Sequence, residues 1–306
     1  MTSAKITIIT PCLNRANFIR DAIESVLAQD YKKIEHIIVD GGSTDGTLEL
    51  IASYPYLKVI SGPDKGLYDA VNKGLQQAHG EIIGLLNSDD FYESDIFKPV
   101  VALFQSNPDT DVVIGKATVL SEMKQGSREE FYPTISSQNI TKIIIQGAPI
   151  INAWFFRKKV FDQVGLFDLN YPIAADRDFL IRLNMQDIKF SFFERVVYHY
   201  RQHAQSLTIT HNSQSQTKVL LENLILAEYY LKQDFANSSY KALLREWHDL
   251  TAVELFLRFV RQIEFAKATT IIELGTRFNH EWYSVLTTQI WLRSKEKLQK
   301  WFQPLA

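Results

Sequence analysis

The chain has 306 residues, of which 46% are hydrophobic, and a formal net charge of −2. This length suffices for a sizeable core and favours one large domain with an appendage. Because the chain has no basic surplus and no short nucleic-acid-binding signature, we expect no nucleic acid partner. Cys12 is the only cysteine, which excludes an internal disulfide and a thiolate zinc site and fits a reducing compartment.

The first residues pass directly into a strand-like run and lack the apolar core of a signal peptide. No apolar stretch reaches the length of a membrane-spanning helix. We therefore expect a cytoplasmic protein.

Strands and helices alternate over the first hundred residues. Apolar runs at 6–10, 34–39, 57–60 and 82–86 predict buried strands, and helical spacing of apolar residues follows at 18–27, 47–53 and 67–78. This alternation predicts a parallel sheet with right-handed crossovers. The chain lacks both G-x-G-x-x-G after the first strand and G-x-x-x-x-G-K-[ST], which excludes two familiar nucleotide-binding folds.

Polar residues follow one predicted strand after another, at Asp40, Asp64 and Asp89. The clearest case is the run 82–90 (IIGLLNSDD), where a buried strand ends in an amide, a hydroxyl and two carboxylates. Ligands of open α/β sheets bind beyond such strand ends, and clustered carboxylates suit a hard divalent cation with a phosphorylated ligand. The alternative is a polar turn that caps the helix starting near Ser94.

The second half of the chain has a different pattern. Shorter strands are predicted at 112–114, 131–132, 153–156 and 188–200, with helices at 159–164 and from 174 onward. A polar stretch at 210–218 predicts a boundary between an α/β domain at 1–210 and a helical region at 211–306. In that region, amphipathic helices are predicted at 216–233, 239–266 and 281–302.

Four motifs in a fixed order carry a resemblance to a known family. They are residues 10–15 (TPCLNR), 39–47 (VDGGSTDGT), 62–74 (GPDKGLYDAVNKG) and 84–90 (GLLNSDD). The set resembles the family 2 glycosyltransferases of the GT-A fold, in the branch that builds bacterial surface polysaccharides of the colanic acid or exopolysaccharide type. The resemblance spans residues 5 to about 205 and implies a mixed, mainly parallel sheet flanked by helices.

The resemblance implies an inverting transfer of one sugar from a nucleotide-sugar, with uridine expected, to a hydroxyl of a saccharide or lipid-linked acceptor. A divalent metal, Mn²⁺ or Mg²⁺, is implied as cofactor. No Q-x-x-R-W signature is present, which argues against a processive synthase. One rival is a sugar-1-phosphate nucleotidyltransferase, but its basic, Gly-rich loop after the first strand is represented here only by Arg15. A second rival is a catalytically inactive nucleotide-sugar-binding or scaffold protein. The third is a purely structural membrane-surface helix protein, against which the carboxylates at the strand ends argue.

The resemblance also assigns the donor site by position. Asp40 would accept the imide N–H of uracil, or else cap the following turn, and Asp45 would contact the nucleotide or cap the helix at Thr47. Arg15 could instead be a surface charge, and an exposed turn is the alternative for Asp64 and Lys65. The full set of implied nucleotide-binding residues is Pro11, Asn14, Arg15, Asp40, Ser43, Asp45, Asp64, Lys65, Asn87 and Ser88.

Metal binding is assigned to Asp89, the last Asp of the family's D-x-D motif, and to His203, for which a surface loop is the alternative. Asn87 replaces the first Asp of that motif; its amide oxygen can coordinate a cation but brings no charge.

An inverting transfer needs one base, which the family places at the start of a helix. The best match is Asp176, with Asp178 as the fallback; the alternative for Asp176 is a helix N-cap. Acceptor contacts are assigned to Asp90, Trp154 and Asp178, with a core or rim position as the alternative for Trp154.

The last predicted helix interleaves Trp282, Trp291 and Trp301 with Arg293 and Lys295. Such a helix could lie on an anionic membrane surface at the inner face of the plasma membrane. The alternatives are packing on the catalytic domain or on another subunit, and the sequence leaves a homo-oligomer open.

Overall fold

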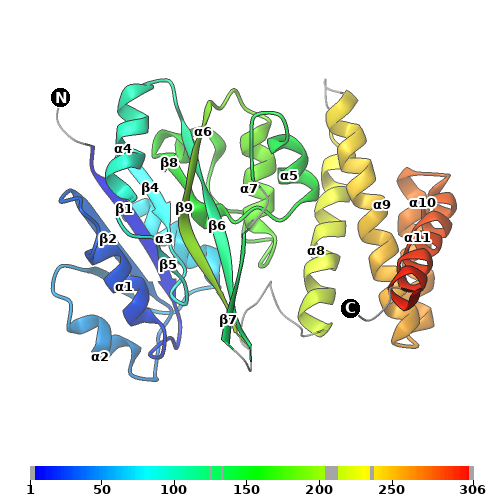
Figure 1. Cartoon of the computed structure of the whole chain (residues 1–306), viewed down its shortest axis with the longest axis horizontal. Coiled ribbons are helices and arrows are strands. Elements are labelled where there is room, and N and C mark those ends of the chain that lie inside the picture. The colour runs from blue at the N-terminus through cyan, green and yellow to red at the C-terminus, as the bar shows by residue number, and fades with distance from the viewer. Residues whose placement is uncertain (1–3, 124–125, 132–133, 204–212, 235–237, 303–306) are drawn as a thin grey trace. The chain divides into compact units, whose positions relative to one another are not determined.

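The computed structural model describes residues 4–123, 126–131, 134–203, 213–234 and 238–302, without the side chains at 122–131, 213, 294 and 296–302. The chain divides into two compact units, Met1–Thr210 and His211–Ala306. Figure 1 traces the first unit from β1 to β9 and the second from α8 to α11.

The first half of unit one forms the parallel part of a sheet. Its strands are β1 (Ile6–Cys12), β2 (Ile34–Asp40), β3 (Lys58–Ser61) and β4 (Ile82–Leu85), in the spatial order β3-β2-β1-β4. The helices α1 (Ile19–Leu27), α2 (Thr47–Ala52) and α3 (Leu67–Gln77) connect them. Every residue of β1 and β4 is buried, as the continuous apolar runs predict for strands covered on both faces.

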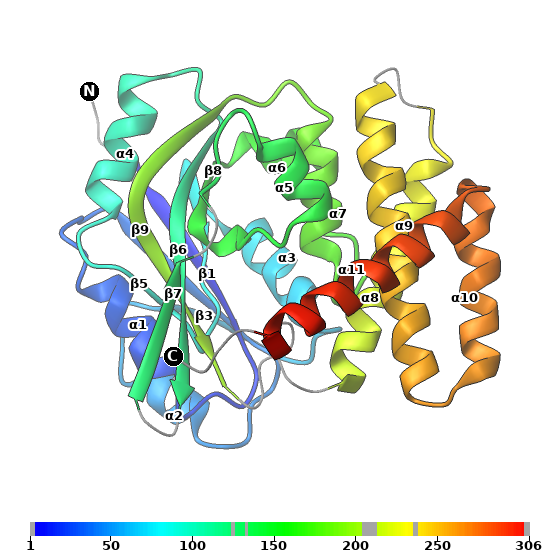
Figure 2. The same ribbon diagram turned by 45° about the vertical axis from the view of Figure 1, so that its right-hand side comes forward.

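The second half extends the sheet with mixed strands. After β4 come β8 (Trp154–Arg157, antiparallel), β6 (Val112–Met123), β9 (Phe190–Gln202) and the short β5 (Phe91–Tyr92), while β7 (Gly126–Phe131) pairs with β6. The long β6 and β9 run parallel and side by side (Figure 2), with a register irregularity between Ile114 and Ala117. β5, which follows β4 along the chain, pairs with residues 198–199 of β9 and so brings the end of β9 close to the loop after β4.

Among the described residues of this unit, four helices and a short 3-10 turn complete the fold. They are α4 (Phe97–Ser106), α5 (Ile140–Gln146), the turn η1 (Ile151–Ala153), α6 (Lys159–Val164) and α7 (Ala175–Asn184). Rings of β8, α6 and α7 pack together in the core: Phe156 lies 5.4 Å from Phe161 and 5.9 Å from Phe179, measured between ring centroids. This aromatic cluster fixes α7, whose first turn carries Asp176.

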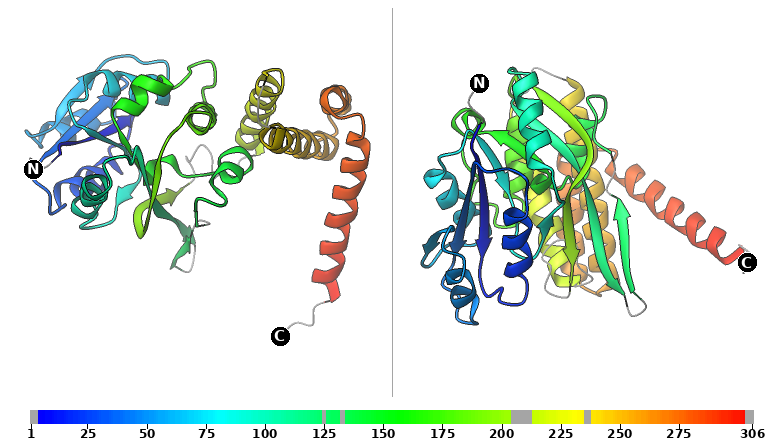
Figure 3. Two further views of the ribbon diagram at one scale, coloured as in Figure 1. Left: turned by 90° about the horizontal axis from the view of Figure 1, so that it is seen from above. Right: turned by 60° about the vertical axis from the view of Figure 1, so that its left-hand side comes forward.

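The second unit consists of α8 (Ser213–Leu231), α9 (Ser238–Arg261), α10 (Phe265–Phe278) and α11 (Trp282–Phe302). Its core includes Leu255, Phe259, Ile271 and Trp282, all at most 4% exposed. Trp282 packs over Gly275, where a Cβ would lie 2.4 Å from the indole ring. In both views of Figure 3 the end of α11 projects beyond the other helices of this unit.

The expected fold class is confirmed, whereas several predicted elements differ in extent. β1 continues through Pro11 to Cys12, and β6 runs for 12 residues where only 112–114 was predicted. The prediction missed α5, and it missed α10 by extending one helix from 239 to 266. Ile263, at φ 60°, ends α9 in a left-handed turn that no glycine or proline marks in the sequence.

Candidate functional site

The carboxyl ends of the parallel strands bring three loops together. Cys12 pairs with Asp40 across β1 and β2, and Ile9 pairs with Leu85 across β1 and β4. The loops that follow these strands therefore leave the same edge of the sheet, as the polar residues after successive strands predict.

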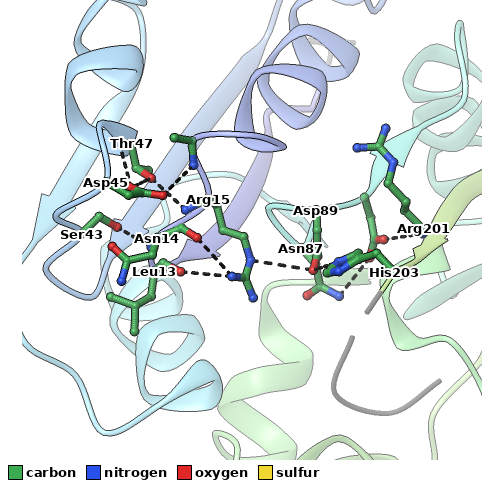
Figure 4. A network of polar contacts seen from close by, with 12 residues as sticks. Leu13, Asn14, Arg15, Ser43, Asp45, Thr47, Asn87, Asp89, Arg201 and His203 are labelled. Carbon is green, nitrogen blue, oxygen red and sulfur yellow. Dashed lines mark hydrogen bonds and ion pairs between the residues drawn. The ribbon is translucent and has the colours of Figure 1, made fainter. Parts of the chain in front are cut away.

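The loop after β1 is tied to the loop after β2. Asn14 adopts a left-handed conformation, at φ 54°, and its amide oxygen accepts the Thr44 N–H at 2.9 Å. The Asn14 N–H in turn donates to the Ser43 hydroxyl at 2.8 Å. Asp45 accepts the N–H groups of Ala16 and Thr47, both at 3.1 Å, so it caps α2 and holds the first loop as well. Asn14, Ser43 and Asp45 are thus one preformed surface (Figure 4).

Asp40 lies beneath this surface and is fully buried. Its carboxylate accepts hydrogen bonds from the N–H groups of Gly42 and Ser43 and from the hydroxyls of Ser43 and Ser61, at 2.5–3.1 Å for the shortest contact of each group. Burial raises the pKa of Asp40, but these hydrogen bonds outweigh burial and bring it below its usual value. The contacts realise the turn-capping alternative for Asp40.

Asp64 is the carboxylate that lies over the end of β2. A Cβ on Gly41 would meet Asp64 Oδ2 at 2.6 Å, so glycine at 41 leaves the room that the Asp64 side chain occupies. Asp64 Oδ1 accepts the Gly66 N–H at 2.9 Å, which fixes the turn before α3. The side chain is partly exposed and Lys65 beside it is exposed. Asp64 therefore faces outward where Asp40 faces inward.

Asp89 and His203 meet at the far side of the edge. Asp89 Oδ2 lies 3.0 Å from His203 Nε2 and 3.8 Å from Arg15 Nε. The Arg15 guanidinium also donates to the carbonyls of Leu13 and Asn14, at 3.3 and 3.2 Å. Figure 4 shows Arg15 reaching from the first loop toward the Asp89–His203 pair. The structure thus joins three residues that the sequence predicted separately: Arg15, Asp89 and His203.

Asp90 points away from this surface into the core. It is 1% exposed and accepts hydrogen bonds from the Tyr198 hydroxyl at 2.5 Å, the Arg201 N–H at 2.7 Å and the Asn87 amide at 3.1 Å. Burial, with the neighbouring Asp89 charge, raises the pKa of Asp90 to about 7. The expectation that Asp90 faces the acceptor is corrected: it fastens β9 to the end of β4. Ser88, 5% exposed, is buried as well.

The residues present fit a divalent ion held by few protein ligands. Within the part of the chain that the structure describes, no three His, Cys, Asp or Glu side chains converge. Asp89 and His203 offer one carboxylate and one imidazole, a mixed set that suits Mn²⁺ better than Mg²⁺. The Asn87 oxygen instead accepts the Asn152 amide at 3.3 Å. An ion here would take its remaining ligands from a bound diphosphate and water.

Asp176 opens α7 at a partly buried position. Burial raises the pKa of Asp176, while the Arg177 charge and hydrogen bonds from the Arg177 N–H and the Tyr68 hydroxyl act against it. A carboxylate with a raised pKa suits a general base that works near neutral pH. The Arg177 guanidinium donates to the Ile145 carbonyl at 2.8 Å and so holds the end of α5.

Two predicted acceptor residues belong to the core. Asp178 is 3% exposed and forms an ion pair with Arg182 at 2.8 Å. Trp154 has no exposed surface, and its ring lies 6.3 Å from that of Phe190. Because neither side chain is open to a ligand, both are corrected to structural roles. Pro11 is buried within β1.

The sequence reading missed residues that support the site from a distance. Phe18 stacks on His203 at 4.7 Å between ring centroids, and the Arg201 guanidinium lies 5.6 Å from the Phe18 ring. Tyr198 and Tyr68 hold Asp90 and Asp176. Tyr68 lies inside the motif at 62–74, and this was the one available signal.

Comparison with known proteins decides the family. The model described as Glycosyl transferase family 2 matches residues 7–165. The chain belongs to glycosyltransferase family 2. A PGL/p-HBAD biosynthesis glycosyltransferase of Mycobacterium tuberculosis is 30% identical over 189 residues, covering 60% of this chain and 70% of that protein. An uncharacterized glycosyltransferase of the same species is 28% identical over 199 residues, again 60% and 70% of the two chains.

Solved structures show the same fold. Residues 1–349 of S. aureus TarS in complex with UDP-GlcNAc align with a TM-score of 0.63 at 18% identity, covering 92% of both chains. The mannosyltransferase PcManGT of Pyrobaculum calidifontis, in complex with GDP-Man and Mn²⁺, aligns with a TM-score of 0.60 at 15% identity, covering 98% of this chain and 83% of that one. The GT-A fold is thereby confirmed, and the family 2 assignment makes the protein a glycosyltransferase.

Proposed function

We propose that this glycosyltransferase moves a single sugar from a nucleoside-diphosphate sugar, with UDP as the nucleotide, to an acceptor hydroxyl with inversion at the anomeric carbon. The observation that carries the proposal is the meeting of Asp89 and His203, 3.0 Å apart, beside Arg15 and the preformed surface of Asn14, Ser43 and Asp45. This edge offers charge for a diphosphate and a fixed backbone for a nucleoside.

The nucleobase end of the donor would lie at Asp64. Asp40 has its oxygens committed to its own loop, whereas the Asp64 carboxylate is partly exposed above Gly41. A carboxylate there accepts the imide N–H of uracil, and it would meet only an acceptor nitrogen in cytosine. Arg15 and Lys65 would contact the phosphates.

The divalent ion would be held by Asp89 and His203. When bound, it neutralises charge that develops on the departing diphosphate. Mn²⁺ fits these two ligands, and the complex of PcManGT with GDP-Man and Mn²⁺ supports this choice.

Asp176 would act as the base. It accepts the proton of the acceptor hydroxyl while that oxygen forms a bond to the anomeric carbon. The bond from that carbon to the donor phosphate breaks, its electron pair leaves with the nucleoside diphosphate, and the configuration inverts.

The acceptor would belong to a cell-surface glycolipid or polysaccharide. A relative named for PGL/p-HBAD biosynthesis supports a role in the biosynthesis of a glycosylated product. The UDP-GlcNAc complex of TarS supports a UDP-sugar donor, while the GDP-Man complex makes GDP the nucleotide to test against it.

We also propose that the helical unit contacts the inner face of the plasma membrane. Trp282, one residue expected at that surface, is instead fully buried in the helical core. Trp291 is 60% exposed, and Lys295 Nζ lies 5.2 Å above its ring. The side chain of Trp301 lies outside the described residues. Within the described chain no helix has the length and apolar character to cross a membrane, so the contact would be peripheral.

The membrane contact is tested by co-sedimentation with vesicles that contain anionic or only zwitterionic lipid. We expect binding to the anionic vesicles that Trp291→Ser weakens, with Tyr56→Ser as an exposed control. Binding that ignores both the lipid charge and Trp291 would refute the contact.

The donor site is tested by calorimetric titration with UDP, CDP and GDP, with and without Mn²⁺. We expect Mn²⁺-dependent binding of UDP that Asp89→Ala and His203→Ala each weaken by at least tenfold. Asp64→Asn should reduce the preference for UDP over CDP. Tight binding of GDP with no response to UDP would move the assignment to guanosine, and binding that ignores all three substitutions would place the donor elsewhere.

Turnover tests the base. Asp176→Asn should reduce kcat by 10²-fold or more, within the range for loss of a general base, and leave donor affinity unchanged. Asp187→Asn, at an exposed position three residues after α7, serves as the control. Retained turnover in Asp176→Asn would refute the assignment, and NMR of the product anomer decides between inversion and retention.

A further inference from the structure

We propose that Tyr68 is a positioning residue for the general base, Asp176, and that it couples the donor loop to that base. This inference rests on the proposed role of Asp176. Tyr68 lies in the first turn of α3, directly after the loop that carries Asp64 and Lys65. Its hydroxyl donates a hydrogen bond to the Asp176 side chain at the start of α7. One residue thus links the nucleotide end of the site to the reacting end.

The Tyr68 ring has a fixed support. It stacks on Phe167 with the ring centroids 5.2 Å apart and an angle of 27° between the planes. Phe167 is 3% exposed, and its ring lies 4.8 Å from that of Phe179 in α7. The Tyr68 hydroxyl therefore belongs to a ring whose stacking partner, Phe167, packs on the helix that carries Asp176.

Asn72 fastens the loop before α7 to the same face of α3. It lies four residues after Tyr68, one helical turn along. Its amide donates to the Phe167 carbonyl at 2.9 Å and accepts the Phe167 N–H at 3.0 Å. With both backbone groups of Phe167 held by one side chain, the distance between α3 and the approach to α7 is fixed, and so is the place of Tyr68 relative to Asp176.

The hydrogen bonds orient the Asp176 carboxylate. Asp176 Oδ1 accepts the Arg177 N–H at 2.7 Å, and the Tyr68 hydroxyl adds a second donor. These two donors limit rotation of the carboxylate, and both favour its ionised form. Of the charged groups nearby, Arg177 favours the ionised form, while Asp178 is neutralised by Arg182.

Removal of the hydroxyl should raise the pKa of Asp176, because a donor to the ionised form is lost. A base must be ionised to act, so the acidic limb of kcat against pH moves to higher pH. We expect Tyr68→Phe to shift this limb upward by roughly one pH unit, the size of one hydrogen bond to a charged group. On the acidic side of this limb kcat should fall by up to about tenfold, while the alkaline plateau and KM for the donor stay within about twofold.

The experiment measures kcat and KM from pH 5.5 to 9 for the full chain with the sugar donor selected by the titrations above. The matched control is Tyr56→Phe, since the Tyr56 hydroxyl donates only a long bond of 3.4 Å to the Ile23 carbonyl. Tyr68→Leu removes the ring as well and separates loss of the hydroxyl from loss of packing. A uniform loss of kcat at every pH in Tyr68→Phe, or an unshifted limb, would overturn the proposal.

Asp176→Asn distinguishes failure of this proposal from failure of the base assignment. If that variant is inactive and Tyr68→Phe keeps the wild-type profile, Asp176 is still the base and Tyr68 has no positioning role. If Asp176→Asn turns over like the wild type, both assignments are refuted.

Discussion

Replacement of His36 by glutamine should change how the stability of the catalytic unit depends on pH. His36 lies in β2, is 1% exposed, and its Nε2 lies 2.9 Å from the Thr10 hydroxyl in β1. Burial lowers the pKa of His36 from 6.5 to about 3. The folded protein therefore keeps this ring neutral at pH values where the unfolded chain protonates it.

The magnitude follows from linkage between protonation and folding. Below pH 6.5 the unfolded state binds the extra proton, so the free energy of unfolding falls by about 1.4 kcal/mol for each pH unit. At pH 5 the loss is about 2 kcal/mol. Asp90 acts in the opposite sense, because its pKa is raised and the folded state takes up a proton as the pH falls below about 7. The wild type alone would hide both effects.

The comparison of His36→Gln with the wild type isolates the histidine, since Asp90 is present in both. We expect His36→Gln to be the less stable protein at pH 7.5, and this deficit to shrink by about 2 kcal/mol at pH 5. Urea denaturation is monitored by hydrogen exchange at residues 6–12 and 34–40, which reports on the unfolding of this unit separately from the helical unit. His280→Gln, at an exposed position in the other unit, is the control. A deficit that is constant between pH 7.5 and 5 would refute a buried, neutral His36.

Three further substitutions test packing that the structure makes specific. Gly275→Ala should destabilise the helical unit by about 1–3 kcal/mol, because its Cβ would lie 2.4 Å from the Trp282 indole; tryptophan fluorescence during thermal unfolding measures this, and an unchanged Tm would contradict it. Arg182→Leu removes the ion pair of the buried Asp178 and should cost about 3–5 kcal/mol of folding free energy. The double variant that adds Asp178→Asn should recover part of this loss; no recovery would show that the Arg182 bonds to Val164 and Leu166 matter more. Gly41→Ala should displace the Asp64 carboxylate and weaken UDP binding by about tenfold, measured by calorimetric titration. Circular dichroism should show that the variant keeps its fold. Unchanged affinity for UDP would argue against Asp64 as the contact to uracil.

The parallel half of the fold was predictable because each of its signals is local. Continuous apolar runs gave β1, β2 and β4, and the polar residues after them gave the edge of the site. The mixed half was harder, since β9 places polar and aromatic residues along a strand that is only partly buried. The turn between α9 and α10 was missed because Ile263, a β-branched residue, adopts a left-handed conformation there.

For the site, the sequence predicted chemistry better than direction. Asp40, Asp64, Asp89 and Asp90 all follow strands and all carry the same group, yet Asp40 and Asp90 point inward. Their direction depends on donors from distant segments, such as Ser61 and Tyr198, which no local pattern reveals. For Trp154 the sequence allowed a position in the core or a contact with the ligand. The pairing of β8 with β6 buries its side chain completely.

The far end of the site shows why long-range pairing decides function here. The family match ends at residue 165, whereas Asp176 and His203 lie beyond it. His203 reaches Asp89 because β9 pairs with β6 and β5, two strands that lie within the matched residues. Arg201 lies in β9 and His203 directly follows the strand, and the Phe18 ring contacts both side chains.

Aromatic rings and carboxylates from the first hundred residues contact the side chains at the end of β9 and directly after it. Phe18 contacts both His203 and Arg201, and Phe91 contacts both Arg201 and His199, at 4.7–5.6 Å. Each of these three side chains also meets its own carboxylate: His203 meets Asp89, Arg201 meets Asp21 and His199 meets Glu93. The rings of Phe18 and Phe91 and the side chains of His203, Arg201 and His199 form one continuous series of contacts. A change at Arg201 should therefore disturb His203, although Arg201 is itself paired with Asp21. Arg201→Met should therefore weaken Mn²⁺ binding in calorimetry about as much as Phe18→Leu does, and Mn²⁺ affinity unaffected by either change would show that His203 is positioned by its own loop alone.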